Sequence, residues 1–477
     1  MSSLRDRLRR QLGTPKPEPA PEPLRESRES AVEADDGPSV GERLQTMFRR
    51  SGAARQTILR TGRARSVEPA AQGGASLGAP RFTAPRGPRP TDPSRPPTPP
   101  PALAQELRGD DGGAWFHCTA HLPAGHRHGA IPLDDVLDVD GRGAVLLSGD
   151  PALADFDPTE ALFFDLETTG LMGGGGNLAF IVGVATVDAE GAVDLTQFLL
   201  REPGDEAALL DGVRPLIERA RCLVSFNGKS FDRHVLADRF VMNRMDGDLV
   251  LDKPHLDLIH PARRLYRSSG GGCGLGALEE RCLRVFRDDD LPGSEAPAAW
   301  FAWLRTGDRK AVRRVQDHNA LDLISLVGLT AHLHRCVVAP GAALPDPRAL
   351  VQAGRLLVER GDHRTGEEVL RLVARGDASD PVVYGALHVL GEHLRRGRRY
   401  DEAVSLWQRM RLAAGLADVH PWIALAIAFE HRLGRTGDAL DLVDELWARQ
   451  GEGYLTAEQR EDLERRRERL QRKAARA

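Results

Sequence analysis

The order of apolar runs predicts a layered α/β domain between residues 161 and 335. Three strand-like runs come first, and helical and strand-like spacing then alternate, which is typical of a sheet covered by helices. The predicted strands are a run that ends at Glu167 and residues 178–187, 193–200 and 221–226, and the predicted helices are residues 207–220, 275–285, 298–304 and 310–334.

Two carboxylates stand at the end of the first predicted strand. Phe163 and Phe164 lead into Asp165 and Glu167, and a Thr-Thr-Gly turn follows. Residues two apart on a strand point to the same side, so these carboxylates would lie next to each other. Neighbouring carboxylates resist joint ionisation, and such a pair usually holds a divalent metal. The alternative is a strand that ends in a solvated acidic turn.

Two later segments add further candidate ligands. The strand at residues 221–226 breaks at Asn227-Gly228, a turn signal, and Ser230 or Asn227 could cap the helix that follows. Asp232 would then lie in the first turn of that helix. Farther along, His318 and Asp322 are four residues apart, so they share one face of a predicted helix.

Together, these carboxylates and the histidine resemble the motifs of the DEDD superfamily of 3′–5′ exonucleases, which has a ribonuclease H-like fold. The resemblance implies that two divalent ions, Mg²⁺ or Mn²⁺, are held by Asp165, Glu167, Asp232 and Asp322. It also implies that His318 orients the attacking water. One departure is the spacing of His318 and Asp322, which is that of the Tyr subclass, whereas the His subclass usually has four intervening residues.

Residues from about 112 to 335 also resemble the YprB-type ribonuclease H-like family of bacteria, which joins such a domain to tetratricopeptide-like helices. The stretches that carry this resemblance are FFDLETTGLMGGGGNLAFIVGVA, LVSFNGKSFDRHVL, HLDLIHPARRLYR, CGLGALEERCL, DDDLPGSEAP and DHNALDLISLVGL.

Several residues are candidates for contact with a nucleic acid. Arg263, Arg264 and Tyr266 would form a phosphate and stacking platform, although a plain surface helix is nearly as good an interpretation. Lys229, next to the second motif, would contact a phosphate or be solvated. Thr168 and Asn227, at the two predicted turns, complete the set. The glycine run at 173–176 would allow close approach of a nucleotide or form a flexible hairpin.

Two regions precede the α/β domain. Residues 1–108 are rich in Pro, Arg, Ala, Glu and Ser, and they lack the apolar positions needed to offset ordering entropy, so we expect disorder with short helices at 4–12 and 40–59. Residues 109–160 read as a small β-rich lead-in that runs through residues 144–147. Its histidines and Cys118 match no standard zinc spacing, which favours a structural role.

The region from residue 345 to 477 repeats. Gly361, Gly397 and Gly434 each follow a helical run, at separations of 36 and 37 residues, near the tetratricopeptide period. Such repeats stack into a curved surface that usually binds a protein partner, or here packs on the nuclease-like domain. The charged run at 461–473 is expected to be a solvated helix.

Composition narrows the class of protein. The chain has 477 residues, 41% of them apolar, a net charge of −4 and five scattered cysteines. These values indicate several domains with real cores, no global attraction to polyanions and no disulfide framework. We expect a cytoplasmic protein without a signal peptide or a membrane-spanning run.

The sequence therefore predicts a metal-dependent nuclease, a 3′–5′ exonuclease on DNA or RNA, with a ribonuclease H-like core and helical repeats. Two alternatives remain open: a non-catalytic adaptor whose repeats bind partners, and a structure-specific endonuclease with the same metals. DNA and RNA cannot be separated at this stage, because recognition of the 2′-hydroxyl depends on local geometry.

Overall fold

The structure, a computed structural model, describes residues 98–110, 112–170, 176–288, 290–414, 418–449 and 455–476. The chain divides into two units, residues 1–81 and 82–477, and every described residue belongs to the second. The predictions for residues 1–97, including both short helices, and for the glycines at 173–175 lie outside the described residues.

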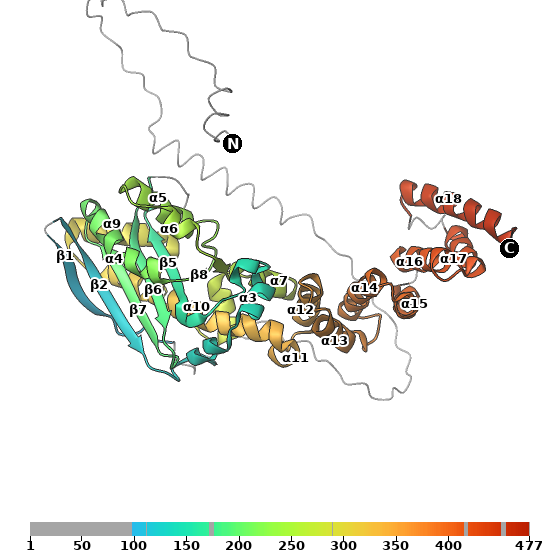
Figure 1. Cartoon of the computed structure of the whole chain (residues 1–477), viewed down its shortest axis with the longest axis horizontal. Helices are drawn as coiled ribbons and strands as arrows, with labels where there is room; N and C mark the ends of the chain where they lie inside the picture. Colours follow the sequence, from blue (N-terminus) through green and yellow to red (C-terminus); the bar gives the residue numbers. More distant parts are fainter. Residues whose placement is uncertain are drawn as a thin grey trace, which may run out of the picture. The chain divides into compact units, whose positions relative to one another are not determined.

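A seven-stranded mixed sheet forms the centre of the α/β domain (Figure 1). Its order is β1-β2-β7-β6-β5-β8-β9, and only the pairs β5–β8 and β8–β9 are parallel. The strands are β1 (Ala104–Asp110), β2 (Gly113–Leu122), β5 (Ala161–Thr168), β6 (Ala179–Val187), β7 (Val193–Leu200), β8 (Cys222–Ser225) and β9 (His255–Asp257). The predicted central strands are therefore present, and the sheet continues at both edges.

The lead-in belongs to this sheet, because β2 pairs with β7 along its length. A short ribbon of β3 (Arg127–His128) and β4 (Ile131–Pro132) follows, and then a 3₁₀ turn at Leu133–Asp138. The prediction of strand at residues 144–147 is wrong, since they lie in helix α3 (Gly141–Ser148). Asp140 caps this helix by accepting from the Gly143 N–H, and Gly149 ends it in the left-handed conformation (φ 74°).

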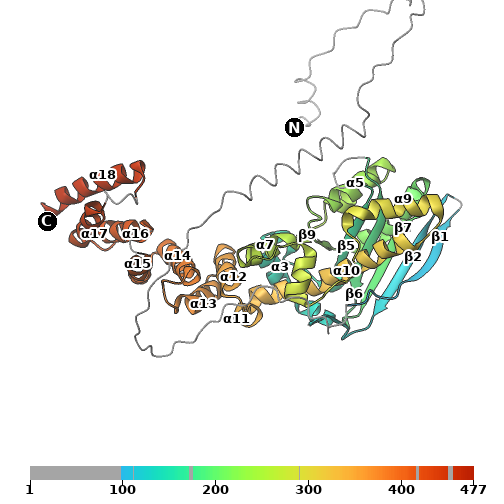
Figure 2. The ribbon, with the colours of Figure 1, turned by 180° about the vertical axis from the view of Figure 1, so that it is seen from behind.

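Helices cover both faces of the sheet. Leu162, Phe164 and Leu166 of β5 pack in one apolar cluster with α4 (Glu206–Arg219) and α5 (Asp232–Met242). Phe163 points the other way and packs with the long helix α10 (Lys310–Val338), which crosses the opposite face beside α9 (Ala296–Thr306; Figure 2). By the same alternation, Asp165 and Glu167 point to the face that carries α10.

Helix α10 is the central helix of the domain. It is long and apolar enough to cross a membrane by length and composition, but 78% of its most apolar window is buried inside the protein, as in a core helix. Its 29 residues extend about 44 Å. One helix can therefore take part in several distant regions of the molecule.

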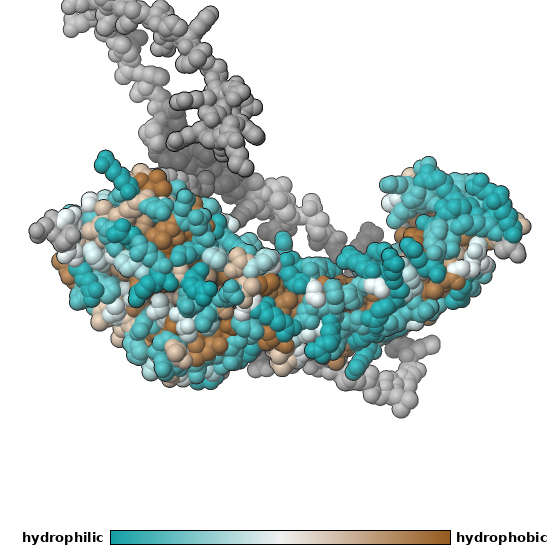
Figure 3. All heavy atoms as spheres, in the orientation of Figure 1, coloured by the Kyte–Doolittle hydropathy of each residue, from teal (hydrophilic) through white to brown (hydrophobic). Residues whose placement is uncertain are grey.

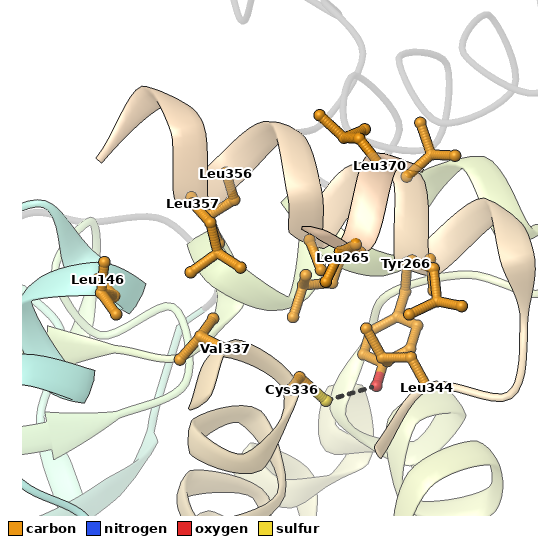
Figure 4. Packing of buried hydrophobic residues seen from close by; sticks show 14 of the residues in the cluster. Leu146, Leu265, Tyr266, Cys336, Val337, Leu344, Leu356, Leu357 and Leu370 are labelled. Atoms are coloured by element: carbon orange, nitrogen blue, oxygen red, sulfur yellow. Dashed lines mark hydrogen bonds between the residues drawn. The ribbon is translucent and has the colours of Figure 1, made fainter. Parts of the chain in front are cut away.

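The end of α10 packs against the first helices of the C-terminal region (Figure 4). Cys336 and Val337 meet Leu265 and Tyr266 of α7 (Ile259–Tyr266), together with residues of α12 (Pro347–Glu359) and α13 (His363–Ala374). The residues contributed by the two later helices include Leu356, Leu357 and Leu370. The C-terminal region therefore begins inside the apolar core of the α/β domain.

The rest of the C-terminal region is helical. Its helices are α14 (Pro381–Arg396), α15 (Tyr400–Ala414), α16 (His420–His431), α17 (Thr436–Ala448) and α18 (Ala457–Ala474). The expectation that the last, highly charged helix is solvated is wrong in part, because Leu463 and Leu470 are buried and three cations reach Glu430 of α16.

Three short helices lie elsewhere among the described residues, namely α6 (Asp248–Leu251), α8 (Leu275–Leu278) and α11 (Pro340–Ala343).

The surface in Figure 3 is largely hydrophilic, with scattered apolar areas. One such area lies over α5, whose exposed large apolar residues are Val241 and Met242 (62% and 58% exposed). Isolated exposed apolar residues are normal for folded proteins, so this area carries no functional conclusion.

Candidate active site

Asp165 and Glu167 lie on β5 beside a strand that leaves room for them. Asp165 pairs with Gly183 of β6, and the register shifts at Glu167 and Thr168. A Cβ atom at Gly183 would lie 2.1 Å from the Asn319 side-chain oxygen, so only glycine lets α10 come this close. The Asn319 amide donates to Asp165 Oδ2 at 2.8 Å.

Asn319 is itself fixed by a second side chain. Gln197 of β7 donates to Asn319 Oδ1 at 2.9 Å and to the Gln316 carbonyl at 2.7 Å. Since Gln197 settles which end of the Asn319 amide accepts, Asn319 presents its N–H group to Asp165. Asn319 is therefore a site residue that was not predicted from the sequence, although it lies next to His318.

Asp232 is the first residue of α5 and is buried, which confirms its predicted place in the first turn. The predicted cap is wrong, because the N-cap residue is Phe231 and no side chain caps the helix. Instead, Asp257 of β9 fixes the turn that precedes α5. Its carboxylate accepts from the Asn227 N–H at 2.7 Å and from the Lys229 N–H at 3.0 Å. Asn227 adopts the left-handed conformation (φ 71°) in this turn.

The four predicted carboxylates act on one another electrostatically. Burial raises the pKa of Asp165 well above its usual value, and the charges of Asp322, Asp232 and Glu167 add to this. Burial raises the pKa of Glu167 to about 8 and that of Asp232 to about 7, with further contributions from neighbouring carboxylates. The structure therefore brings the four groups within range of one another's charge, and burial outweighs the opposing effect of His318 on the pKa of Glu167.

His318 faces this group from α10. Its Nδ1 atom lies 2.7 Å from Asp290 Oδ1, and its Nε2 atom lies 3.6 Å from Asp322 Oδ2. Burial alone would lower the pKa of His318, but the bond to Asp290 and the charges of Asp322 and Glu167 raise it to about 9. The imidazole is therefore oriented by one carboxylate and directed toward another.

Arg287 is a site residue that the sequence analysis missed. Its guanidinium donates to Asp322 Oδ1 at 2.5 Å and also pairs with the buried Glu279. Glu279 belongs to a π-helical turn, Glu279–Leu283, where a regular helix through residue 285 was predicted. Arg287 has no signal in the sequence, because the loop that carries it follows no apolar period.

The carboxylates suit a divalent metal by their chemistry. Mg²⁺ and Mn²⁺ prefer hard oxygen ligands, and the four carboxylates supply them, with Glu167 and Asp232 buried and Asp165 and Asp322 partly exposed. Within the described part of the chain, however, no three His, Cys, Asp or Glu side chains are already gathered closely enough to hold an ion. The residues therefore fit the metals in kind, and Asp322 would have to exchange its bond with Arg287 for one to an ion.

The residues predicted to contact substrate differ in how accessible they are. Thr168 is buried, and its hydroxyl donates to the Gly170 carbonyl at 2.7 Å. Lys229 lies beside the site, with its Nζ atom 3.8 Å from Asp150 Oδ2. Arg263 is exposed, whereas Arg264 pairs with Glu359 of α12. These positions leave the predicted contacts of Lys229 and Arg263 as predictions.

The stacking role predicted for Tyr266 is wrong. Its side chain is 5% exposed, and its hydroxyl lies 2.6 Å from His332 Nε2 and 3.4 Å from Cys336 Sγ. Burial also raises its pKa. The ring is thus part of the core at the end of α10 (Figure 4) and is not available to a base.

The histidines of the lead-in do not converge on a common site. His117 and His121 bond to different carboxylates, those of Glu106 and Asp194. His128 is buried and bonds to Ser325 of α10 at 2.8 Å. Each of these three histidines thus has its own structural partner.

Comparison with known proteins assigns the α/β domain to a class. Residues 162–334 match the family model described as RNase_H superfamily, so this part of the chain is a ribonuclease H-like domain. That class suggests nuclease activity on a nucleic acid, and it generally uses divalent metals.

One similar protein is the "Uncharacterized protein YprB" of Bacillus subtilis (strain 168). It is 29% identical to this chain over 328 residues, which is 68% of this chain and 78% of that protein. The similarity therefore extends well beyond the 173 residues, 162 through 334, that match the superfamily model.

Proposed function

We propose that this protein is a metal-dependent nuclease that removes nucleotides from the 3′ end of DNA or RNA. The observation that carries the proposal is the group of four carboxylates from β5, α5 and α10, in which burial and neighbouring charges raise the pKa values of Asp165, Glu167 and Asp232. The 3′–5′ polarity rests on the resemblance of the motifs to the DEDD superfamily.

Asp165, Glu167, Asp232 and Asp322 would hold two divalent ions, Mg²⁺ or Mn²⁺. Such ions supply Lewis-acid charge and lower the pKa of an attacking water. The bond from Asn319 keeps Asp165 in one orientation, which limits the rearrangement that binding requires. Arg287 neutralises Asp322 in the metal-free protein, and its release would leave a guanidinium close to the reacting phosphate.

His318 would orient the attacking water or deprotonate it. The second role needs the neutral ring, and ions that neutralise the charges of Asp322 and Glu167 would remove part of what raises its pKa. Asp290 binds its Nδ1 atom and thereby fixes the ring, with Nε2 directed toward Asp322. A general base must lie within hydrogen-bond reach of the proton that it takes, and an orienting carboxylate on the other ring nitrogen is a common support. Lys229 and Arg263 would contact phosphates of the strand near this centre.

The test is digestion of DNA and RNA oligonucleotides labelled at either end, single- and double-stranded, with Mg²⁺ or Mn²⁺. We expect a ladder that shortens from the 3′ end, no cleavage in EDTA, and no cleavage of a circular single strand. Cutting of the circle would instead favour the structure-specific endonuclease.

We expect Asp165→Asn to abolish metal-dependent cleavage with little loss of fold, because the substitution keeps the shape of the side chain and removes its charge. Asp194→Asn is the matched control, since Asp194 is exposed and its one ion-pair partner within the described residues is His121. Undiminished cleavage by Asp165→Asn, with contaminating nuclease excluded, would refute the assignment.

We also propose that α12 to α17 are tetratricopeptide-like repeats that bind a protein partner. Three helix pairs follow one another, and each pair is joined by a turn with positive φ, at Gly361, Arg398 and Gly434. Pull-down with the full chain and with the truncated chain described in the Discussion tests this proposal.

A further inference from the structure

A cavity of about 320 Å³ opens where α10 begins, on the side of β1 and β7. Three cationic side chains line it, those of Arg309, Lys310 and Arg313. The indole of Trp303 and the amide of Gln316 form other parts of its wall. No carboxylate belongs to the described residues that line this cavity, so every charged side chain in that lining is positive.

Two of the three cations lack an ion-pair partner in the part of the chain that the structure describes. Among the described residues, Arg309 and Lys310 have no ion-pair partner, and the Arg309 guanidinium stacks over the Phe116 ring at 4.5 Å from its centroid. Arg313 pairs with Asp317 at 3.1 Å, and both side chains stay partly exposed. Stacking holds the Arg309 group in place and leaves its N–H edge free to bind.

The local backbone makes this concentration of positive charge unfavourable without a ligand. Cations in the first turn of a helix lie at the positive end of its dipole, where they are normally disfavoured. Asp308 offsets this only in part, since its carboxylate accepts from the Lys310 backbone N–H at 3.0 Å. The helix end alone would not define a site, but here it adds to a lined cavity with two unpaired cations.

We propose that this cavity binds a phosphate group of the nucleic-acid strand, some distance from the bond that is cleaved; this rests on the proposed nuclease function. Arg313 precedes His318 by five residues, which is about 7.5 Å along the helix, and Lys310 precedes Asp322 by about 18 Å. Residues four apart on a helix are neighbours, so Lys310, His318 and Asp322 follow one gradually turning row along α10. A strand that follows this row would run from the cavity to the carboxylates.

A free phosphate ion or a mononucleotide would be recognised by the same cations. Comparing the binding of short and long oligonucleotides separates these ligands from a nucleic-acid strand. Lys310, which the cavity variant changes, lies about 18 Å from Asp322 along the helix, and the two phosphates of a trimer cannot span that distance. The cavity should therefore strengthen the binding of a 20-mer and leave the binding of a trimer unchanged.

The experiment measures binding of labelled single-stranded 3-mers and 20-mers by fluorescence anisotropy over a range of KCl concentrations. The parent is the full chain with Asp165→Asn, which prevents cleavage, and the cavity variant adds Arg309→Gln and Lys310→Gln. The matched control adds Arg364→Gln and Arg396→Gln, which remove two exposed arginines of the C-terminal helices. Melting curves establish that all three proteins are equally folded.

We expect the cavity variant to bind the 20-mer roughly tenfold or more weakly and to bind the trimer unchanged. The slope of log affinity against log salt should fall by about 1.4, for two lost contacts to a single strand. The control should match the parent. Equal 20-mer affinity and equal salt slope in the cavity variant and the parent would overturn the inference. It would also be overturned if the cavity variant lost a thermal shift caused by inorganic phosphate but bound the 20-mer as the parent does.

The two proposals can fail separately. If the wild type cleaves oligonucleotides and the cavity variant binds the 20-mer as the parent does, the nuclease stands and the phosphate site is refuted. If the wild type cleaves nothing while the cavity variant still loses 20-mer binding, the phosphate site stands and the nuclease is refuted.

Discussion

The raised pKa values of single site residues make the stability of the metal-free protein depend on pH. The pKa values of Glu167 and His318, about 8 and 9, exceed the 4.5 and 6.5 of the free side chains. Between those limits the folded protein keeps protons that the unfolded chain has released. Folding disfavours the charged form of Glu167 and favours the charged form of His318. In both cases the folded state binds the proton more tightly, so the free energy of unfolding falls as pH rises.

We therefore predict that the free energy of unfolding in EDTA falls as pH rises from 6.5 to 8.5. The slope should approach about 1.4 kcal/mol per pH unit for each retained proton. Urea titrations at several pH values measure it. Glu167→Gln and His318→Gln should each reduce the slope, and saturating Mg²⁺ or Mn²⁺ should also reduce it. A flat profile in EDTA would mean that these groups are not held as the structure shows.

His318 has a second consequence, for the reaction itself. If it deprotonates the water, His318→Ala should lower the cleavage rate by roughly 10²–10⁴, the usual range for a positioned base. Affinity for Mn²⁺, followed by thermal shift, should change little, because the four carboxylates remain. A rate within a factor of two of wild type would exclude the role.

At the scale of elements, α18 depends on one buried carboxylate. The Glu430 side chain is fully buried, and it accepts two bonds from Arg469, at 2.9 and 2.8 Å, and one from Lys473 at 2.7 Å. Its bond with Arg469, followed by that with Lys473, lowers its pKa to about 2 against the opposing effect of burial. Because a lowered carboxyl pKa stabilises the ionised fold, this contribution is present above pH 4.5 and fades as pH falls toward 2.

We predict that Glu430→Gln releases α18 at neutral pH, with a loss of about 1–3 kcal/mol for charge-assisted bonds to cations that are partly exposed. Hydrogen exchange of residues 457–474 measures the release. Glu461→Gln is the control, because its ion pair with Arg465 is exposed and should contribute little. Unchanged exchange in Glu430→Gln would contradict the docking of this helix.

Elements with a clear period were predictable from the sequence, and contacts between distant segments were not. Asp165 and Glu167 were assigned to one face because strands alternate, and His318 and Asp322 because helices repeat near four residues. Gln197 and Asn319 are 122 residues apart, so nothing local links them. Arg287 lies in an irregular loop. Tyr266 was misplaced because its arginine neighbours suggested exposure, whereas it lies one turn after Ala262 on the buried face of α7.

At the scale of the whole molecule, the α/β domain and the first C-terminal helices share a core. Leu356 and Leu357 of α12 lie with Val337 and Leu265 in this core (Figure 4), and Arg142 of α3 pairs with Asp362 at 2.6 Å. The boundary expected at residue 345 therefore cuts through packed apolar surface. A cut after α13, near residue 379, leaves these contacts intact.

We predict that a chain ending at residue 344 is poorly soluble or melts at lower temperature, because it exposes the α7 and α10 surface that α12 covers. A chain ending at residue 379 should stay folded, keep metal-dependent cleavage of short oligonucleotides and lose protein partners. Differential scanning fluorimetry, cleavage assays and pull-down compare the two chains with the full protein. A folded but inert 1–379 chain would make the later helices part of the active unit.

Because α10 is one continuous helix, it limits where residues can be inserted into or deleted from this protein. Asp322 and Cys336 are separated by 14 residues, or about four turns, within one uninterrupted helix. Inserting a single residue between them would rotate the core-packing end by about 100° relative to the carboxylate-bearing end and lengthen the helix by about 1.5 Å. Either the site or the junction would then lose its partners. Insertions and deletions are thus admissible in the loops of this domain but not in the middle of α10.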